Sequence, residues 1–343
     1  GCAAVEPECD LVEEVLRLGG LDGVPPVSLP VASPVPRPAL TPKQSRAALA
    51  RRVLAARGMQ DCVTYGFLAR DTAALFGDTP DSLRLENPIA SDLDQMRPTP
   101  VVSLAMAAAR NAARGFSDLA LAEIGGAYRE AGQLAVAAGV RAGLTPPNWA
   151  APARPVDWSD AKGDALAVLA ALGVPMAAVQ VTADAPGFYH PGRSGVLRQG
   201  PKTVLATFGE LHPKLRTTLD LPGSVVAFEV FLDSIMEPKR RKRGIPDLPA
   251  FQPVRRDFAF LADATVPADA LLRAARATDK ALITDVTLFD RYAGEKLPEG
   301  KVSLAIQVTL QPRERTLTDA EIEAAGQKVV AAVTKATGAV LRG

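Results

Sequence analysis

Two stretches, FQPVRRDFAF (251–260) and ITDVTLFDRYAGEKLPEGKVSLAIQVTLQPRERTLTDAEIEAA (283–325), decide the fold of the C-terminal part of the chain. Residues 302–310 alternate strictly between Val, Leu or Ile and Ser, Ala, Gln or Thr, which predicts a strand with one buried face. Thr318 and Glu321 have the spacing of a capping box, so a helix is expected to begin there. In chain order we expect strand 257–262, helix 267–277, strands 283–292 and 302–310, a helix after Thr318 and a strand at 339–341.

This βαββαβ order is the ferredoxin-like layout, in which helices cover one face of a sheet and leave the other open. The open face is expected to carry small polar side chains edged by basic loops, a surface suited to single-stranded RNA. Charge alone leaves an ordinary solvated surface equally open, because residues 251–343 carry thirteen Lys and Arg against twelve Asp and Glu. The basic residues of these loops are Arg255, Arg256, Arg291, Lys296, Lys301, Arg313 and Arg315.

Composition narrows the class of protein. The 343 residues carry a net charge of +1, so no global field selects nucleic acid or membrane. Cys2, Cys9 and Cys62 form neither an even framework nor a CxxC motif, which indicates a reducing compartment and argues against a zinc site. No apolar run reaches about 18 residues and no signal peptide begins the chain, so we expect a cytoplasmic protein without a membrane partner.

Proline and charge patterns divide the chain. An amphipathic helix is expected at 10–18. Seven prolines in 24–42 predict an extended connector, and Thr41 is the expected N-cap of a helix at 43–57. A basic segment at 238–244, flanked by helix breakers, precedes the C-terminal domain. We therefore expect a remnant of a preceding domain at 1–24, a linker at 25–42, a mixed core at 43–240 and a ferredoxin-like domain at 248–343.

Longer motifs resemble one known family, the β subunit of phenylalanyl-tRNA synthetase. The C-terminal motifs resemble its ferredoxin-fold anticodon-binding domain, the central ones its synthetase-like core, and the first one the end of the small domain before that core. The C-terminal motifs are PVRRDFAF (253–260), VTLFDRYAGEKLPEGKVSLA (286–305) and RERTLTDAEI (313–322). The central motifs are ENPIASDLDQMRPT (86–99), ARNAARG (109–115), LALAEIGGAYR (119–129), FYHPGRSG (188–195) and FGELHPKL (208–215). The first motif is CDLVEEVLRLGGLDGVPPVSLP (9–30).

The resemblance implies an α+β fold, with a class-II-synthetase-like antiparallel sheet core followed by the ferredoxin-like domain. It also implies a non-catalytic subunit of a ligase. In the family the α subunit uses ATP and Mg²⁺ to attach phenylalanine to tRNA(Phe), and the β core supports α in an (αβ)₂ heterotetramer. The terminal domain takes the anticodon arm, for which the expected contacts are Arg255, Arg256, Phe289, Arg291, Tyr292, Lys301, Arg313 and Arg315.

Three acids of the first helix, Asp10, Glu13 and Glu14, share one face at spacings of three and four residues. Like charges at this spacing repel, and Mg²⁺ would relieve the repulsion, although acids in a first turn also favour the helix dipole. In the resembled family the matching positions are magnesium ligands at the contact with α. The family pattern has a further aspartate where this sequence has Ala4, so the expected ligand set is incomplete.

The sequence provides no convincing catalytic group. A class II core needs a phosphate-gripping arginine and a glycine-rich strand–helix ending in arginine. Arg97 and Glu123 lie where the first could fall, but no counterpart of the second exists, so Arg97 is interpreted as structural or interfacial. His190 and His212 both precede proline and are expected to be structural. Nothing near Cys62 in the sequence would lower its pKa.

Two other functions stay open at this stage. One is a stand-alone RNA-binding or regulatory paralogue that has lost the α subunit. The other is an independent adenylating enzyme, against which the missing glycine-rich arginine motif argues.

Overall fold

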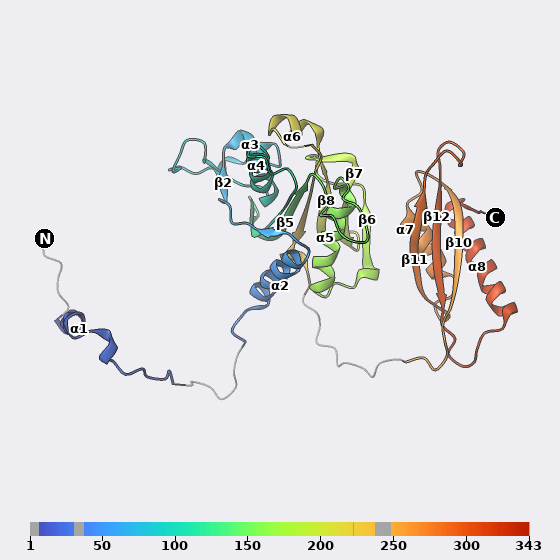
Figure 1. Ribbon diagram of the computed structural model, residues 1–343, viewed down its shortest axis with the longest axis horizontal. Coiled ribbons are helices and arrows are strands. Elements are labelled where there is room, and N and C mark those ends of the chain that lie inside the picture. The colour runs from blue at the N-terminus through green and yellow to red at the C-terminus, as the bar shows by residue number, and fades with distance from the viewer. Residues whose placement is uncertain (1–6, 31–37, 222, 237–247, 343) are drawn as a thin grey trace. The chain divides into compact units, whose positions relative to one another are not determined.

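The computed structural model describes residues 7–30, 38–221, 223–236 and 248–342 (Figure 1). The chain divides into two units, residues 1–41 and 42–343. In the first, α1 (Pro7–Gly19) is followed by a 3₁₀ turn, Leu21–Gly23, so the expected helix exists and begins three residues earlier than predicted. Ala4 and the basic segment 238–244 lie outside the described residues.

A seven-stranded sheet forms the centre of the second unit, in the order β1-β4-β5-β9-β8-β7-β6. All neighbouring pairs are antiparallel except β1 and β4, so the sheet is mixed and the expectation of a wholly antiparallel sheet was wrong. The reason is that β1 enters from α2 (Pro42–Ala56) rather than from a hairpin, and such an edge strand is free to run parallel. The strands are β1 (Gln60–Asp61), β4 (Leu119–Arg129), β5 (Gly132–Ala142), β6 (Val179–Thr182), β7 (Tyr189–Gln199), β8 (Thr203–Leu211) and β9 (Val225–Phe231).

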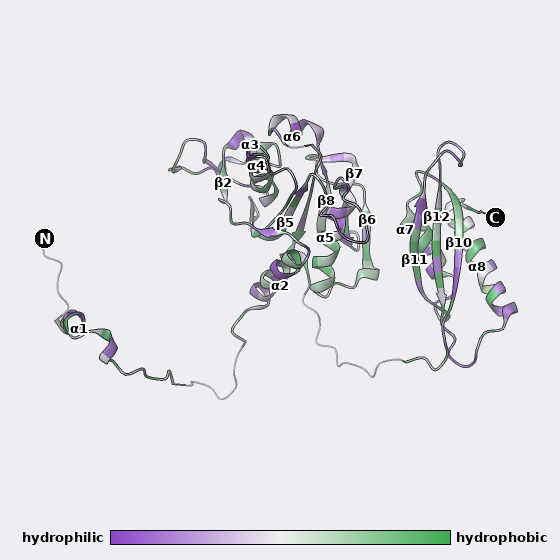
Figure 2. Cartoon of the chain, in the orientation of Figure 1, coloured by the Kyte–Doolittle hydropathy of each residue, from purple (hydrophilic) through white to green (hydrophobic). Residues whose placement is uncertain are grey.

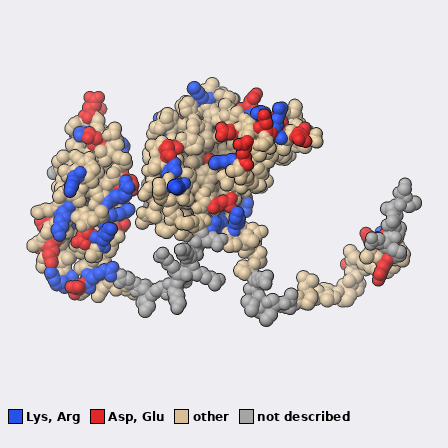
Figure 3. All heavy atoms as spheres, turned by 180° about the vertical axis from the view of Figure 1, so that it is seen from behind, with Lys and Arg blue, Asp and Glu red and all other residues tan. Residues whose placement is uncertain are grey.

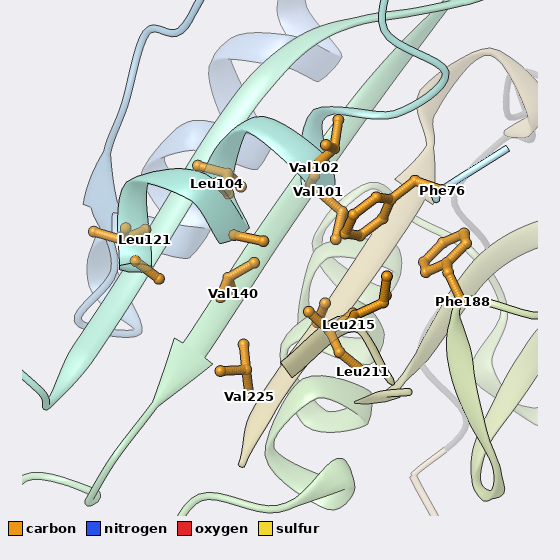
Figure 4. Packing of buried hydrophobic residues seen from close by; sticks show 14 of the residues in the cluster. Phe76, Val101, Val102, Leu104, Leu121, Val140, Phe188, Leu211, Leu215 and Val225 are labelled. Carbon is orange, nitrogen blue, oxygen red and sulfur yellow. The ribbon is translucent and has the colours of Figure 1, made fainter. Parts of the chain in front are cut away.

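Helices cover both faces of this sheet because its central strands are apolar on both sides. In β9, Val225, Ala227 and Phe231 join the cluster under α4 (Pro100–Ala112), part of which Figure 4 shows. The alternate residues of β9 join the cluster under α2 and α5 (Trp158–Ala171). The remaining short elements are β2 (Phe67–Leu68), α3 (Arg70–Ala74), β3 (Gln95–Met96), α6 (Pro213–Thr218) and 3₁₀ turns at Asp81–Leu83, Met176–Ala178 and Leu232–Ser234.

The C-terminal residues confirm the expected βαββαβ order. Their sheet has the order β11-β12-β10-β13 with antiparallel neighbours, and the first strand begins three residues earlier than predicted. Hydrophobic residues of the strands and helices form a separate core, and α8 carries hydrophobic and hydrophilic residues side by side (Figure 2). The elements are β10 (Val254–Asp263), α7 (Ala268–Ala277), β11 (Ile283–Tyr292), β12 (Lys301–Leu310), α8 (Asp319–Thr337) and β13 (Val340–Leu341).

The capping box that was expected at α8 is present and is reinforced by an arginine. The Thr318 hydroxyl accepts from the backbone N–H of Glu321 at 3.4 Å, and Glu321 Oε2 accepts from the backbone N–H of Thr318 at 2.9 Å. Both guanidinium nitrogens of Arg315 also pair with the Glu321 carboxylate. The ion pair with Arg315 and the two interactions with Thr318 lower the pKa of Glu321 from 4.5 to about 2.

The side chain of Arg97 connects β4 to the loops before it. Arg97 is 3 % exposed, and its Nη2 donates to Glu123 Oε1 at 2.7 Å. The Thr64 hydroxyl accepts from Arg97 Nη1 at 2.7 Å and donates to Glu123 Oε2 at 2.6 Å, so both carboxylate oxygens are paired. A Cβ on Gly125 would lie 2.4 Å from Nη2, which is why glycine is required there. The remaining acceptors are Gly126 O at 3.0 Å, Tyr65 O at 3.4 Å and Ser103 Oγ at 3.4 Å.

We expect Arg97→Met to destabilise the core by about 3–5 kcal/mol, because it leaves the buried Glu123 carboxylate without its cation. Arg51→Ala, which breaks the more exposed pair between Arg51 and Asp61, should cost about 1 kcal/mol or less. Urea unfolding followed by circular dichroism measures both. Equal costs for the two variants would contradict a special role of the Arg97–Glu123 pair.

The carboxyl of Glu321 should titrate near pH 2 in a side-chain NMR experiment. Because the folded-state pKa lies below the unfolded value of 4.5, its contribution to stability is complete above pH 4.5 and is lost as the pH falls towards 2. Arg315→Ala should move the midpoint towards 4.5, whereas Lys335→Ala, at the far end of α8, should leave it unchanged. An unaltered midpoint in Arg315→Ala would show that the capping box alone lowers the pKa.

Candidate nucleic-acid interface

The strand register of the C-terminal sheet determines which side chains share its open face. Ser303, Ala305, Gln307 and Thr309 of β12 alternate with the buried apolar residues, as expected from the sequence. Across β10, Arg255 pairs with Thr309, Asp257 with Gln307 and Ala259 with Ala305, so these residues lie on the same open face. Across β11, Tyr292 pairs with Ser303, and Asp290 pairs with Ala305 after a bulge between Leu288 and Asp290.

The predicted RNA contacts do not all lie on this face. Arg255, Tyr292 and Lys301 share it, but Lys301 Nζ is paired with Asp263 at 2.7 Å. Arg256 pairs with Val308 and Arg291 with Leu304, whose side chains point to the helix-covered face. Phe289 lies at the bulge and is 56 % exposed, and Arg313 and Arg315 lie between β12 and α8. The structure therefore brings three of the eight together on the open face.

Acids that the sequence analysis missed share the open face. Asp257 accepts from Gln307 Nε2 at 2.9 Å, and Asp285 accepts from the Thr287 hydroxyl at 2.8 Å. Asp290 is exposed beside Ala305. Figure 3 likewise shows acidic and basic residues interspersed over the visible side of this domain. For Asp290 the sequence held no signal, because the bulge before this residue decides on which face of the sheet its side chain lies.

Small side chains surround Tyr292 on the open face. Ser303 is buried, and Ala259 and Ala305 are half-buried, so the floor consists of small side chains. The ring of Tyr292 lies against Gly294, where a Cβ would come within 2.5 Å of the phenol oxygen. A flat aromatic group could stack on Tyr292 over this floor, and its N–H donors would find the carboxylate of Asp290.

The core residues considered for catalysis have structural partners. The guanidinium of Arg97 is engaged with protein acceptors, and all of FYHPGRSG after Phe188 lies within strand β7 rather than opening a helix. His190 Nδ1 accepts from the backbone N–H of Gly192, and His212 Nδ1 accepts from that of Lys214 as the N-cap of α6. Burial and the charge of Glu123 raise the pKa of the Cys62 thiol, which disfavours the nucleophilic thiolate.

The acids of α1 do not by themselves form a metal site. Both Arg17 Nε and Nη2 donate to Glu14 Oε2, at 2.9 and 2.6 Å, so this carboxylate already has a cation. In the part of the chain that the structure describes, no three His, Cys, Asp or Glu side chains are placed to hold a metal ion. Within its unit, α1 exposes its apolar face as well, including Leu11, Val15 and Leu18. No described helix is long and apolar enough to cross a membrane.

Two family models match the chain. One, described as the phenylalanyl tRNA synthetase beta chain CLM domain, matches residues 26–232, and the other, the ferredoxin-fold anticodon binding domain, matches residues 249–342. A solved pyrrolysyl tRNA synthetase of Desulfitobacterium hafniense aligns over 65 % of this chain and 71 % of its own at 17 % identity, with a TM-score of 0.43, and we draw nothing from a match at that level.

Curated relatives carry one name. The phenylalanine–tRNA ligase beta subunit of Gluconobacter oxydans is 56 % identical over 99 % of this chain, and that of Rhodospirillum rubrum is 52 % identical over 98 % of it. The chain spans 42 % of the length of each of these relatives. Since the model of the synthetase beta chain matches more than half of its residues, this chain belongs to the phenylalanyl-tRNA synthetase β-chain family.

Proposed function

We propose that this chain is the C-terminal part of a phenylalanine–tRNA ligase β subunit, which supports a catalytic α subunit and binds tRNA(Phe) during ATP-dependent aminoacylation in the cytoplasm. The observation that carries the proposal is the succession of the two family matches, 26–232 and 249–342, along one chain. The stand-alone paralogue is disfavoured because the relatives are named as subunits of the ligase.

The core at 43–240 is, in this proposal, a catalytically silent copy of the class II synthetase fold. Its support is chemical: an arginine that grips a phosphate needs free N–H groups, and those of Arg97 are engaged with Glu123, Thr64 and Gly126. Adenylate formation with ATP and Mg²⁺ therefore falls to the α subunit. The core then serves as a rigid support within an (αβ)₂ heterotetramer.

Exposed apolar residues of the core suggest where α binds. Trp149 is fully exposed, and Val63, Tyr65 and Phe116 expose more than half of their surface. Large side chains of this kind are the usual anchors of a stable subunit interface. Asp10, Glu13 and Glu14 stay candidates for a Mg²⁺ site at a contact with α. With Glu14 paired to Arg17, and Ala4 outside the described residues, further ligands would have to come from another part of the assembly.

The terminal domain, 248–343, is proposed to read the anticodon by stacking and by carboxylate acceptors on its open face. A base stacked on Tyr292 lies over the floor of Ser303 and Ala305 and offers its N–H groups to Asp290. A guanine edge, with adjacent N–H donors, suits a carboxylate best. Arg255 on the open face, Arg291 on the helix-covered face and Arg313 between β12 and α8 would then hold phosphates.

For assembly with α, we expect Trp149→Ala and Tyr65→Ala to weaken binding by about 2 kcal/mol or more if these side chains are interface anchors. Arg114→Ala, an exposed polar control in the core, should have no effect. Sedimentation of the α and full-length β chains measures the equilibrium. Sedimentation of the double variant Glu13→Gln/Glu14→Gln, with and without a chelator, tests the magnesium site. If assembly with α is unchanged in all of these samples, both the proposed interface and the proposed magnesium site are refuted.

For tRNA binding, we expect Tyr292→Ala in the αβ assembly to cost about 1–3 kcal/mol with little change in salt dependence, because it removes a stacking platform. Tyr292→Phe should keep most of the affinity. Arg255→Ala should reduce the slope of log K against log salt by about 0.7–0.9, as expected for one lost phosphate contact. If deletion of residues 248–343 leaves both affinity and slope unchanged, the open face is not an RNA site.

A further inference from the structure

The seven-stranded sheet contains a buried carboxyl, that of Glu229, which the proposed RNA and subunit functions do not use. Glu229 lies in β9 and is 2 % exposed. Val225, Ala227 and Phe231 lie two or four residues from Glu229 and point to the sheet face that α4 covers. The side chain of Glu229 therefore lies on that face as well. A glutamate in an otherwise apolar strand that is buried on both faces is costly unless its oxygens are paired.

Only one oxygen of this carboxyl is paired. The Thr207 hydroxyl donates to Oε2 at 3.2 Å, and the Tyr189 hydroxyl lies 3.2 Å from the same threonine oxygen. Oε1 is buried and has no hydrogen-bond partner among the described residues. Burial raises the pKa of Glu229, and interactions with Thr99, Arg129 and Thr207 oppose this only in part. These interactions therefore offset the desolvation of the charged carboxylate only in part.

Glu229 lines a cavity of about 680 Å³, a size typical of small-molecule sites. Phe76, Phe188 and Phe231 contribute apolar walls, and the rings of Phe76 and Phe188 lie beside each other with centroids 5.3 Å apart (Figure 4). Among the described residues the lining also carries Asp78, Glu130 and Arg129. The guanidinium of Arg129 lies over the ring of Phe231, 5.6 Å from its centroid.

We propose that this cavity is a binding site for a small aromatic cation, a flat ring that bears an amidinium or ammonium group. The N–H groups of the ligand pair with the Glu229 carboxylate, and its ring packs among Phe76, Phe188 and Phe231. The lining sets three carboxyls against one guanidinium in the described part of the chain, a balance that favours a cation over an anion. Aromatic walls add attraction for a cationic group.

The test uses benzamidine as the probe and benzamide, its neutral isostere, as the matched ligand, with binding to this chain followed by NMR. We expect benzamidine to bind at least about tenfold more tightly than benzamide, and Glu229→Gln to abolish that preference, since a charge-assisted hydrogen bond is lost. Glu130→Gln removes an exposed acid from the rim of the same cavity and should change the affinity less than about twofold.

The pH dependence of the wild-type chain provides a test that needs no variant. The charged and titratable groups around Glu229 are Arg129 from β4 and Tyr189 from β7, whose pKa burial raises well above its ordinary value, together with Asp78 and Glu130 in the lining of the cavity. Benzamidine affinity should fall as the pH drops through the pKa of Glu229. Because this pKa is raised, the loss of affinity should occur at a higher pH than if an exposed glutamate bound the ligand. Equal affinities for the two ligands, or a benzamidine affinity that is independent of pH, would overturn the proposal.

Discussion

The burial of β9 on both faces is the constraint on which the core depends. All seven residues of this strand are buried, so helices must cover the sheet on each side, and every polar group inside must find a partner within the protein. α4 covers one face and α2 with α5 the other. The mixed character of the sheet follows as well, because the edge strand β1 is reached from α2 and runs parallel to β4.

Two buried glutamates show two different outcomes of this constraint. Glu123 is paired on both oxygens by Arg97 and Thr64, and the approach of the guanidinium is so close that Gly125 is required beneath it. This network stabilises the fold, but it leaves neither oxygen of Glu123 available to a ligand. Glu229 keeps an unpaired oxygen beside a cavity, and this is the feature that distinguishes a candidate site from a core ion pair.

In the proposed RNA complex, the C-terminal sheet would stack and read bases on one surface and hold phosphates at others. Its open face combines small side chains, Tyr292 and carboxylates, which suit stacking and base edges better than phosphates. Several of its arginines lie at the margins or on the helix-covered side, and Arg315 is committed to the cap of α8. Because the chain is almost neutral, the proposed RNA binding would depend on local contacts of this kind.

The sequence by itself determined the features that rest on neighbouring residues. These include the order of elements after residue 250, the alternation in β12, the capping box of Thr318 and Glu321, and the extended context of His190 and His212. Each depends on spacing along a few residues, which local sterics and hydrogen bonding control.

Only the tertiary structure decided the rest. The bulge in β11 and the register against β12 separate Tyr292 from Arg291, and strand pairing places Asp257 and Asp290 on the open face, where small polar side chains were expected. The run VVAFEVF gave no indication that the carboxyl of Glu229 lies beside a cavity, because the side chains that surround it come from β4, β8 and the segment before α4. Strand pairing and packing between distant segments are not encoded in any local pattern, and they fix which charges are paired and which are left available.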